Sequence, residues 1–167
     1  FGSINILINN AGITKDNLFL RMKKEDWQEV LNVNLFSAFK LTQLVMKDMV
    51  KSKWGRIINI SSGAAKIGNP GQANYVASKS ALEGMTRTLA NEVASRGITV
   101  NCIAPGFIQT NIINSINKDR LETMVSKIPM GRIGESRDIA SAAFFLSSEE
   151  SSYITGQVLH INGGLTM

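Results

Sequence analysis

The stretch RIINISSGAAKIGNPGQANYVASKSALEGMTRTLANEVASRGITVNCIAPG occupies residues 56–106. It begins and ends with short apolar runs, at 56–61 and 98–106, which are rich in β-branched residues and typical of buried parallel strands. Between these runs, a loop of small residues at 62–72 precedes a long amphipathic helix that Gly97 is expected to end. A strand, a helix and a second strand in this order predict a βαβ unit.

The flanking sequence extends this alternation in both directions. An apolar run at 4–12 predicts a strand, and apolar residues at three- and four-residue steps predict a helix from about 24 to 53. Residues 107–128 are less regular and predict a helical excursion above the sheet. Residues 135–148 predict a helix with an acidic first turn, and 156–162 predict a last strand. The alternation indicates an α/β fold with a parallel sheet and helices on both faces.

Composition limits the class of protein. The 167 residues are 44% hydrophobic and 19% charged, which fits a single globular domain over 1–167. No apolar run approaches the ~18 residues of a membrane span. Cys102 is the only cysteine, so we expect no internal disulfide and a reducing compartment. With one histidine, His160, and no Cys/His cluster, the sequence predicts no metal site. The net charge of +5 suits an acidic partner, but no basic helix with aromatic partners indicates nucleic-acid binding.

The sequence begins with Phe1 and not with methionine, and it reaches a strand-like run within four residues. We therefore expect it to be internal to a longer protein. The expected location is the cytoplasm, or an organelle matrix or stroma if a targeting segment lies upstream.

Tyr75 and Lys79 stand four residues apart at the start of the long helix, so their side chains share one face. An ammonium ~4–5 Å from a phenol, at an effective dielectric of ~20, favours the phenolate by roughly 3–4 kcal/mol. The pair thus predicts a tyrosine with a lowered pKa, suited to general acid–base chemistry. The same spacing also fits a half-buried tyrosine beside a solvated lysine. Because functional groups gather at the carboxyl ends of parallel strands, the polar turns that follow the strands should lie near Tyr75.

Five further blocks extend from end to end of the chain. They are NNAGITKDNLFLRM at 9–22, GNPGQANY at 68–75, EVASRGITVN at 92–101, APGFIQT at 104–110 and YITGQVLHINGG at 153–164. Together with Asn34 in NVNL, Ser62 and the Tyr-x-x-x-Lys pair, they resemble the short-chain dehydrogenase/reductase family. Within it they are similar to the bacterial-type 3-oxoacyl-(acyl carrier protein) reductases of fatty acid synthesis. The resemblance implies the C-terminal part of a doubly wound Rossmann-type sheet.

The resemblance also implies a role for each catalytic candidate. Tyr75 would donate a proton to the alkoxide that forms when a ketone receives a hydride. Ser62 would hydrogen-bond the carbonyl oxygen, and Lys79 would lower the phenol pKa and bind the cofactor ribose. Asn34 would hold a water that links Lys79 to solvent. Without the resemblance, an ordinary loop serine, a surface lysine and a mid-helix amide fit the same residues.

The implied cofactor is a nicotinamide dinucleotide, and for this subfamily NADPH. Asn9, Ala11 and Gly12 would line its adenosine-ribose side, while Thr110 and the backbone of Ile108 would contact the nicotinamide. The full set of implied cofactor-binding residues is Asn9, Ala11, Gly12, Tyr75, Lys79, Pro105, Gly106, Ile108 and Thr110.

The glycine-rich dinucleotide loop of the family does not occur in these residues. Three β-α steps of about 30 residues each would place roughly 70–90 residues upstream. The choice between NAD and NADP depends on that segment.

The implied partners are an acyl carrier protein and further copies of the chain in a homotetramer. The basic residues Lys53 and Arg96 are expected to dock the acidic carrier, although a solvated basic face fits them equally well. His160 would lie in the C-terminal segment that packs subunits together, and Cys102 would be an inert core residue. Asn111 stands where the subfamily often has aspartate, and we expect little consequence.

Two other functions stay open at this point. One is a related dehydrogenase that acts on a free sugar, polyol or quinone-like ketone, since residues 107–127 would set that choice. The other is an inactive chain that serves only as an interaction module through its long helices.

Overall fold

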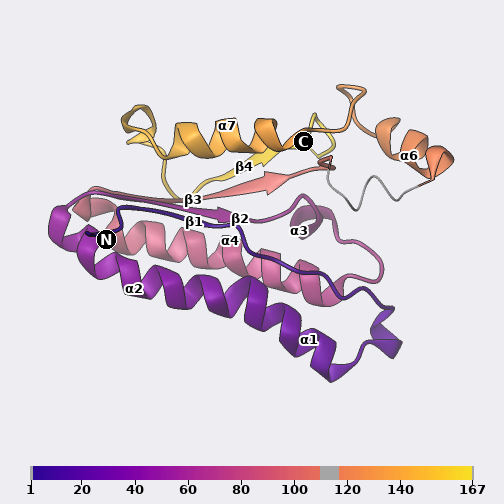
Figure 1. The fold of residues 1–167 in the computed structure, drawn as a ribbon, viewed down its shortest axis with the longest axis horizontal. Helices are drawn as coiled ribbons and strands as arrows, with labels where there is room; N and C mark the ends of the chain where they lie inside the picture. The colour runs from indigo at the N-terminus through magenta and orange to yellow at the C-terminus, as the bar shows by residue number, and fades with distance from the viewer. Residues whose placement is uncertain (1, 110–116, 167) are drawn as a thin grey trace.

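A computed structural model describes residues 2–109 and 117–166 (Figure 1). Its centre is a parallel sheet with the strand order β1-β2-β3-β4. The strands are β1 (Ile6–Asn9), β2 (Gly55–Ile60), β3 (Ile98–Pro105) and β4 (Val158–Ile161). Strand order follows chain order, so each crossover connects neighbouring strands.

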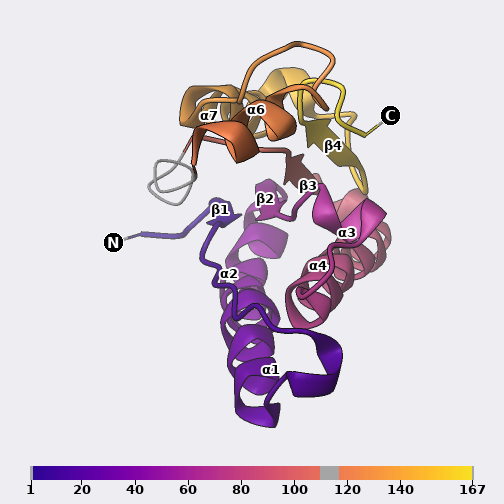
Figure 2. The same ribbon diagram turned by 90° about the vertical axis from the view of Figure 1, so that its right-hand side faces the viewer.

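Helices cover both faces of the sheet (Figure 2). On one face lie α1 (Lys24–Leu31), the π-helical turn η2 (Asn32–Phe36), α2 (Ser37–Ser52), α4 (Ala73–Val93) and the 3-10 turn η3 (Ala94–Arg96). On the other face lies α7 (Ser136–Leu146). The shorter elements are η1 (Phe19–Arg21), α3 (Ala64–Ile67), α6 (Lys118–Val125) and η4 (Glu149–Ser151).

The predicted α/β fold is confirmed, and three elements differ in detail. The helix expected from 24 to 53 contains the π-helical turn η2, and the loop expected at 62–72 contains α3. Of the excursion expected at 107–128, the structure describes α6, while residues 110–116 lie outside the described part of the chain. Gly97 ends the long helix at a φ of 70°, as its position predicts.

Successive residues of β2 send their side chains into different layers of the core. Ile57 packs between the sheet and the α2/α4 layer, with Met49 and Val93. Ile58 packs on the opposite face with α7, against Ala143 and Leu146. This alternation is what a parallel strand covered on both faces requires.

The face of β1 is the exception, because Ile6 and Ile8 remain 45% and 44% exposed. No helix in the described part of the chain combines the length and apolar character that crossing a membrane requires.

Candidate active site

A cavity of about 1050 Å³ lies at the carboxyl ends of β1, β2 and β3. Loops after these strands, the first turns of α4 and one side of α7 form its wall. Its lining residues are Ile8, Asn10, Gly12, Ile13, Thr14, Ile60, Ser61, Ser62, Tyr75, Lys79, Pro105, Gly106, Ile108, Ser136, Ile139, Ala140 and Ala143. The fold therefore brings Gly12, Ser62, Tyr75, Lys79, Pro105, Gly106 and Ile108 together, all of which the sequence analysis selected.

The side chain of Tyr75, in the first turn of α4, forms a hydrogen bond with the side chain of Ser62, which follows β2. A side-chain hydrogen bond from Ser62 lowers the pKa of the Tyr75 phenol, but burial raises it by more, and the Asp16 carboxylate also raises it. The pKa of Tyr75 thus lies above its usual value, so the expectation of a tyrosine with a lowered pKa is wrong for this structure. The physical reason is that desolvation of the phenolate outweighs the hydrogen bond from Ser62. A phenol with this pKa stays protonated at neutral pH and can act as a proton donor.

Lys79 is buried to 3% exposure beneath the cavity floor. Its Nζ donates a hydrogen bond to the backbone oxygen of Ile60 at 2.8 Å and lies 5.7 Å from the centroid of the Tyr75 ring. Burial lowers the pKa of this ammonium to about 8. A buried lysine with a lowered pKa, in a cavity and one helical turn from a protonated phenol, is typical of a functional site.

Asn34 lies behind the cavity in the π-helical turn η2 and is 1% exposed. Its Oδ1 accepts from the backbone nitrogen of Ile13 at 2.8 Å, and its Nδ2 donates to the Ile13 oxygen at 3.0 Å. The same Nδ2 donates to Ser78 Oγ at 3.0 Å, and Ser78 donates to the backbone oxygen of Tyr75 at 2.7 Å. Asn34 and Ser78 thereby hold the loop after β1 against α4.

A second set of contacts fixes the start of α4 to the loop after β1. The backbone nitrogen of Asn17 donates to the Gly71 oxygen at 2.8 Å, and Asn74 Nδ2 donates to the Lys15 oxygen at 3.0 Å. Tyr75 follows Asn74 directly, so these bonds set the position of the phenol relative to the loop.

Gly12 lets the loop approach the lysine closely. A Cβ at this position would come within 3.2 Å of Lys79 Nζ and 3.5 Å of Asn34 Oδ1. The exposed backbone of Gly12, the buried ammonium and the cavity volume fit a dinucleotide ribose and nicotinamide, which need close backbone approach and hydrogen-bond donors.

Three residues that were predicted to bind the cofactor do not line the cavity in the described part of the chain. The Asn9 side chain points into the sheet, where its Nδ2 donates to Thr42 Oγ1 at 3.2 Å and to Asn59 Oδ1 at 2.8 Å. Ala11 is exposed and is not among the described residues that line the cavity. Thr110, like Asn111, lies outside the described residues.

Lys53 and Arg96 lie together, but at the opposite edge of the sheet from the cavity. Lys53 adopts a left-handed conformation at the end of α2, and its backbone oxygen would be 2.4 Å from a Cβ on Gly97. Both basic side chains are exposed at this corner, beside the first residues of β2 and β3.

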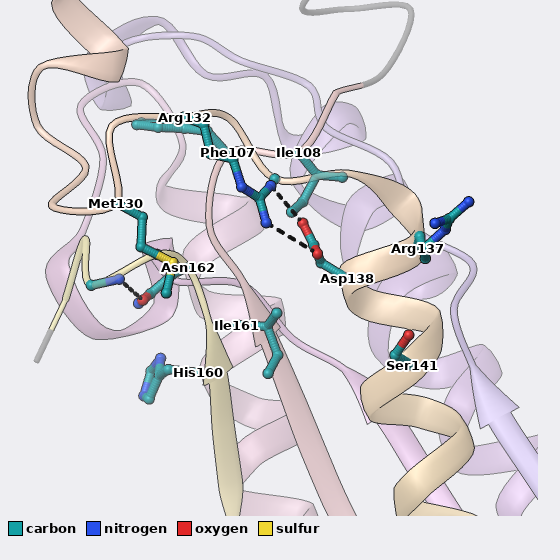
Figure 3. Close-up of a pocket in the computed structure, with 13 residues that line it drawn as sticks. Phe107, Ile108, Met130, Arg132, Arg137, Asp138, Ser141, His160, Ile161 and Asn162 are labelled. Carbon is teal, nitrogen blue, oxygen red and sulfur yellow. Dashed lines mark hydrogen bonds and ion pairs between the residues drawn. The ribbon is translucent and has the colours of Figure 1, made fainter.

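A smaller cavity of about 450 Å³ lies between the start of α7, β4 and the turn after β4 (Figure 3). Arg132 forms an ion pair of 2.9 Å with Asp138, which holds the pKa of that carboxyl below its usual range. Figure 3 shows His160 and Ile161 on opposite sides of β4. No group of three potential metal ligands occurs among residues 2–109 and 117–166.

Cys102 is fully buried in β3 and 3.1 Å from Thr86 Oγ1, and burial raises the pKa of its thiol to about 11. A thiol in this state is a poor nucleophile, which confirms the expectation of an inert core residue.

The cavity also contains residues that sequence reasoning did not select. Asn10 and Thr14 flank Gly12 in a recognised block, so proximity could have suggested them. Ser136, Ile139 and Ala140 are contributed by α7, about 60 residues after the Tyr-x-x-x-Lys pair, and no local pattern indicates them.

Comparisons with known proteins agree with this geometry. A family model described as enoyl-(acyl carrier protein) reductase matches residues 1–166. The chain is similar to 3-oxoacyl-[acyl-carrier-protein] reductases of Vibrio cholerae, Salmonella typhimurium and Escherichia coli K12. It is 50%, 51% and 50% identical to them over 167 residues, which are 100% of this chain and 68% of each relative.

Proposed function

This chain belongs to the short-chain dehydrogenase/reductase family of NAD(P)-dependent oxidoreductases, and we propose that it reduces 3-oxoacyl groups carried on an acyl carrier protein to 3-hydroxyacyl groups. The reaction would serve fatty acid elongation, with NADPH as the hydride donor. The observation that carries the proposal is the convergence of Ser62, Tyr75 and Lys79 on one cavity at the carboxyl ends of the strands.

Proton donation is the task of Tyr75 in this proposal. A nicotinamide cofactor, when bound, would supply the hydride that reduces the 3-oxo carbon. The carbonyl oxygen gains negative charge as the ketone is reduced, and the Tyr75 hydroxyl donates its proton to it. Ser62 already hydrogen-bonds Tyr75, so its hydroxyl is placed to orient the same oxygen.

Lys79 has two roles here. Its charge stabilises the phenolate that proton donation leaves on Tyr75, and its remaining N–H groups would bind the cofactor ribose. Gly12, Pro105, Gly106 and Ile108 line the same cavity and would hold the rest of the nicotinamide half. The roles of Asn9, Ala11 and Thr110 in cofactor binding, and of Asn34 in a water relay, stay predictions.

The proposed partners are an acidic acyl carrier protein and further copies of the chain, assembled as a homotetramer in the cytoplasm. The exposed corner formed by Lys53 and Arg96 is the proposed carrier-docking surface. Attraction between this surface and an acidic carrier would speed encounter and weaken as salt screens charges beyond ~10 Å at 0.1 M.

The test compares two substrates in the full-length protein, a carrier-bound 3-oxoacyl group and a short free 3-ketoester. Exchanging Lys53→Glu together with Arg96→Glu should lower kcat/KM strongly for the first and little for the second. Lys24→Glu reverses an exposed charge at the start of α1, away from the cavity, and serves as the control. Equal losses on both substrates would refute the docking surface, and no turnover of either substrate by the unmodified protein would refute the proposed reaction.

A further inference from the structure

Glu83 extends the Tyr-x-x-x-Lys pair by one further turn of α4. Tyr75, Lys79 and Glu83 are spaced four residues apart, so their side chains follow one another along the same face of the helix. This face is turned toward the end of β2. There Lys79 Nζ donates to the Ile60 oxygen at 2.8 Å, and Ser61 Oγ donates to Glu83 Oε1 at 2.6 Å. The proposed reaction uses the first two residues of this series and leaves Glu83 without a role.

The bond between Ser61 and Glu83 is short and shielded from water. Ser61 is 3% exposed, and an O–H···O distance of 2.6 Å is typical of a hydroxyl that donates to a carboxylate. Ser61 Oγ also lies 3.4 Å from the backbone oxygen of Lys79, one turn before Glu83. The hydroxyl has one proton to donate, and the shorter distance assigns it to Glu83.

Glu83 has a second potential partner on its own helix. Arg87 stands four residues later, and a glutamate that precedes a basic residue by four positions is in the favoured order for an ion pair on a helix. Within residues 2–109 and 117–166, however, neither side chain takes part in an ion pair. Arg87 is exposed, whereas Glu83 is half-buried and its carboxylate is bound to Ser61. The carboxylate is thus directed to the end of β2 and not to the surface of the helix.

Backbone bonds of the sheet do not fix the distance between the end of β2 and α4. The backbone nitrogen of Ser61 donates to the Ile103 oxygen at 2.7 Å, and that of Gly63 donates to the Pro105 oxygen at 2.8 Å. Both bonds run within the sheet toward β3, whereas α4 covers one face of the sheet (Figure 2). The separation between the strand end and α4 therefore depends on side chains that join them, and the Ser61–Glu83 bond is one of these.

We propose that Glu83 is a positioning residue, which acts through Ser61 to hold the end of β2 at a set distance from α4. This inference rests on the proposed function. The residue after Ser61 is Ser62, whose side chain bonds the Tyr75 phenol, so the same distance sets the geometry of that contact. The substrate oxygen must meet both hydroxyls at once. A shift of the strand end away from α4 therefore slows the reaction without removing any reacting group.

The test breaks the bond from each side in the full-length protein. Glu83→Met keeps the length of the side chain but removes the acceptor, and Ser61→Ala removes the donor. Each should slow hydride transfer to the short free 3-ketoester by about 10-fold in single turnovers at saturating cofactor. Cofactor affinity should stay nearly unchanged, because Ile60, which holds Lys79, is fixed by its pairing with Ile103 in the sheet. Stopped-flow measurements give the rate, and cofactor titration gives the affinity.

A conservative variant separates positioning from a merely structural role. Glu83→Gln retains an oxygen that can accept from Ser61, so it should recover most of the rate that Glu83→Met loses. The double variant Ser61→Ala with Glu83→Met should lose no more than either single variant, because both remove the same bond. Glu25→Met, at an exposed position in α1, is the control. Since the bond is broken from both sides, one folded variant is enough to decide.

Three results would overturn the inference. The first is an unchanged hydride-transfer rate in folded Glu83→Met or Ser61→Ala, even with a lower free energy of unfolding, because the bond would then serve the fold alone. The second is a double variant in which the two losses add. The third is a Glu83→Gln variant as slow as Glu83→Met, because charge and not position would then matter. Failure of the unmodified protein to reduce either substrate would instead refute the proposed reaction.

Discussion

Two cations are buried among the described residues, at opposite ends of the same sheet, and their surroundings differ sharply. Arg56, at the start of β2, is 2% exposed. Its guanidinium donates to the backbone oxygens of Gly55 at 2.9 Å, Ser148 at 3.2 Å and Gly97 at 3.3 Å. It also pairs with the Glu149 carboxylate at 3.4 Å and lies 4.6 Å from the Trp54 ring centroid. Three carbonyl oxygens, a carboxylate and an aromatic ring thus surround this cation.

Lys79, at the opposite end, is 3% exposed, but far fewer protein groups form hydrogen bonds with its ammonium. Within the described part of the chain its ammonium donates one hydrogen bond, to the Ile60 oxygen, and burial lowers its pKa to about 8. An ammonium has three donors, so two directions are left for a ligand or substrate. Arg56 is bound as a structural cation, whereas Lys79 destabilises the fold and keeps its capacity to bind. Burial alone therefore does not identify a functional cation, but burial with unused donors does.

The largest expected effect is on catalysis at the Lys79 end. Tyr75→Phe removes only the acidic proton, so turnover should fall by about 10²–10⁴-fold while cofactor affinity stays nearly unchanged. Lys79→Met should reduce both turnover and cofactor affinity, because it removes the charge and the ribose donors together. Stopped-flow hydride transfer and cofactor titration separate the two quantities.

Tyr153→Phe is the matched control, because that tyrosine is fully exposed. If Tyr75→Phe and Lys79→Met behave alike in both measurements, the separate roles assigned to the two residues are incorrect.

The next effect concerns the Arg56 end and is on stability. Arg56→Met leaves the backbone oxygens of Gly97 and Ser148 without this partner, which should lower the free energy of unfolding by about 3 kcal/mol. Urea unfolding measures it, with the exposed Arg120→Met as the control. If Arg56→Met changes the free energy of unfolding by less than the control does, water must replace the hydrogen bonds of the guanidinium without loss of stability.

The sequence predicted the order of strands and helices because the core of each element depends on local periodicity. Ile57, Ile58 and the apolar stripe of α4 are visible as patterns, and Gly97 marks a helix end through its own backbone freedom. Tyr75 and Lys79 were predictable as neighbours for the same reason, since four residues on a helix fix their relative direction.

Properties that depend on tertiary packing were not predictable. The raised pKa of Tyr75 follows from burial beneath other elements, and the inward direction of Asn9 follows from its pairing with Asn59 on the next strand. The bond from Asn34 to Ser78 joins residues 44 positions apart, so no local pattern could indicate it. The hydrogen bonds and ion pair of Arg56 likewise involve Gly97 and Glu149, which are distant in sequence.

A third, smaller effect should have the opposite sign from that at Arg56. Lys79→Met removes an ammonium whose burial opposes folding, so at pH 7 the free energy of unfolding should rise by about 1–3 kcal/mol. The folded pKa of about 8 lies below the ordinary value of 10.5, so the cost is fully present below pH 8. Between pH 8 and 10.5 the unfolded state binds more protons, and the unmodified protein should gain stability as the pH rises.

Urea unfolding at several pH values measures this change, with the exposed Lys47→Met as the control. Measurements should stop near pH 10, because the raised pKa of Tyr75 lowers stability above its ordinary value of 10.0. A variant less stable than the unmodified protein at pH 7 would mean that Lys79 is held as firmly as Arg56.

The smallest expected effect tests whether cofactor binding depends on the space around the Lys79 ammonium as well as on its charge. Gly12→Ala places a Cβ within 3.2 Å of Lys79 Nζ, which is tighter than ordinary contact. Because the ammonium ends a flexible side chain, it can shift by a few tenths of an ångström, and stability should change by less than about 1 kcal/mol. The shifted donors would form poorer hydrogen bonds with the cofactor ribose, so we expect a several-fold weaker cofactor affinity and a smaller loss in turnover at saturating cofactor.

Gly2→Ala, where a Cβ meets nothing within 4 Å, is the control for the substitution itself. If Gly12→Ala binds cofactor as tightly as the unmodified protein, the loop tolerates a side chain at this position, and Lys79 differs from Arg56 in its hydrogen bonding alone.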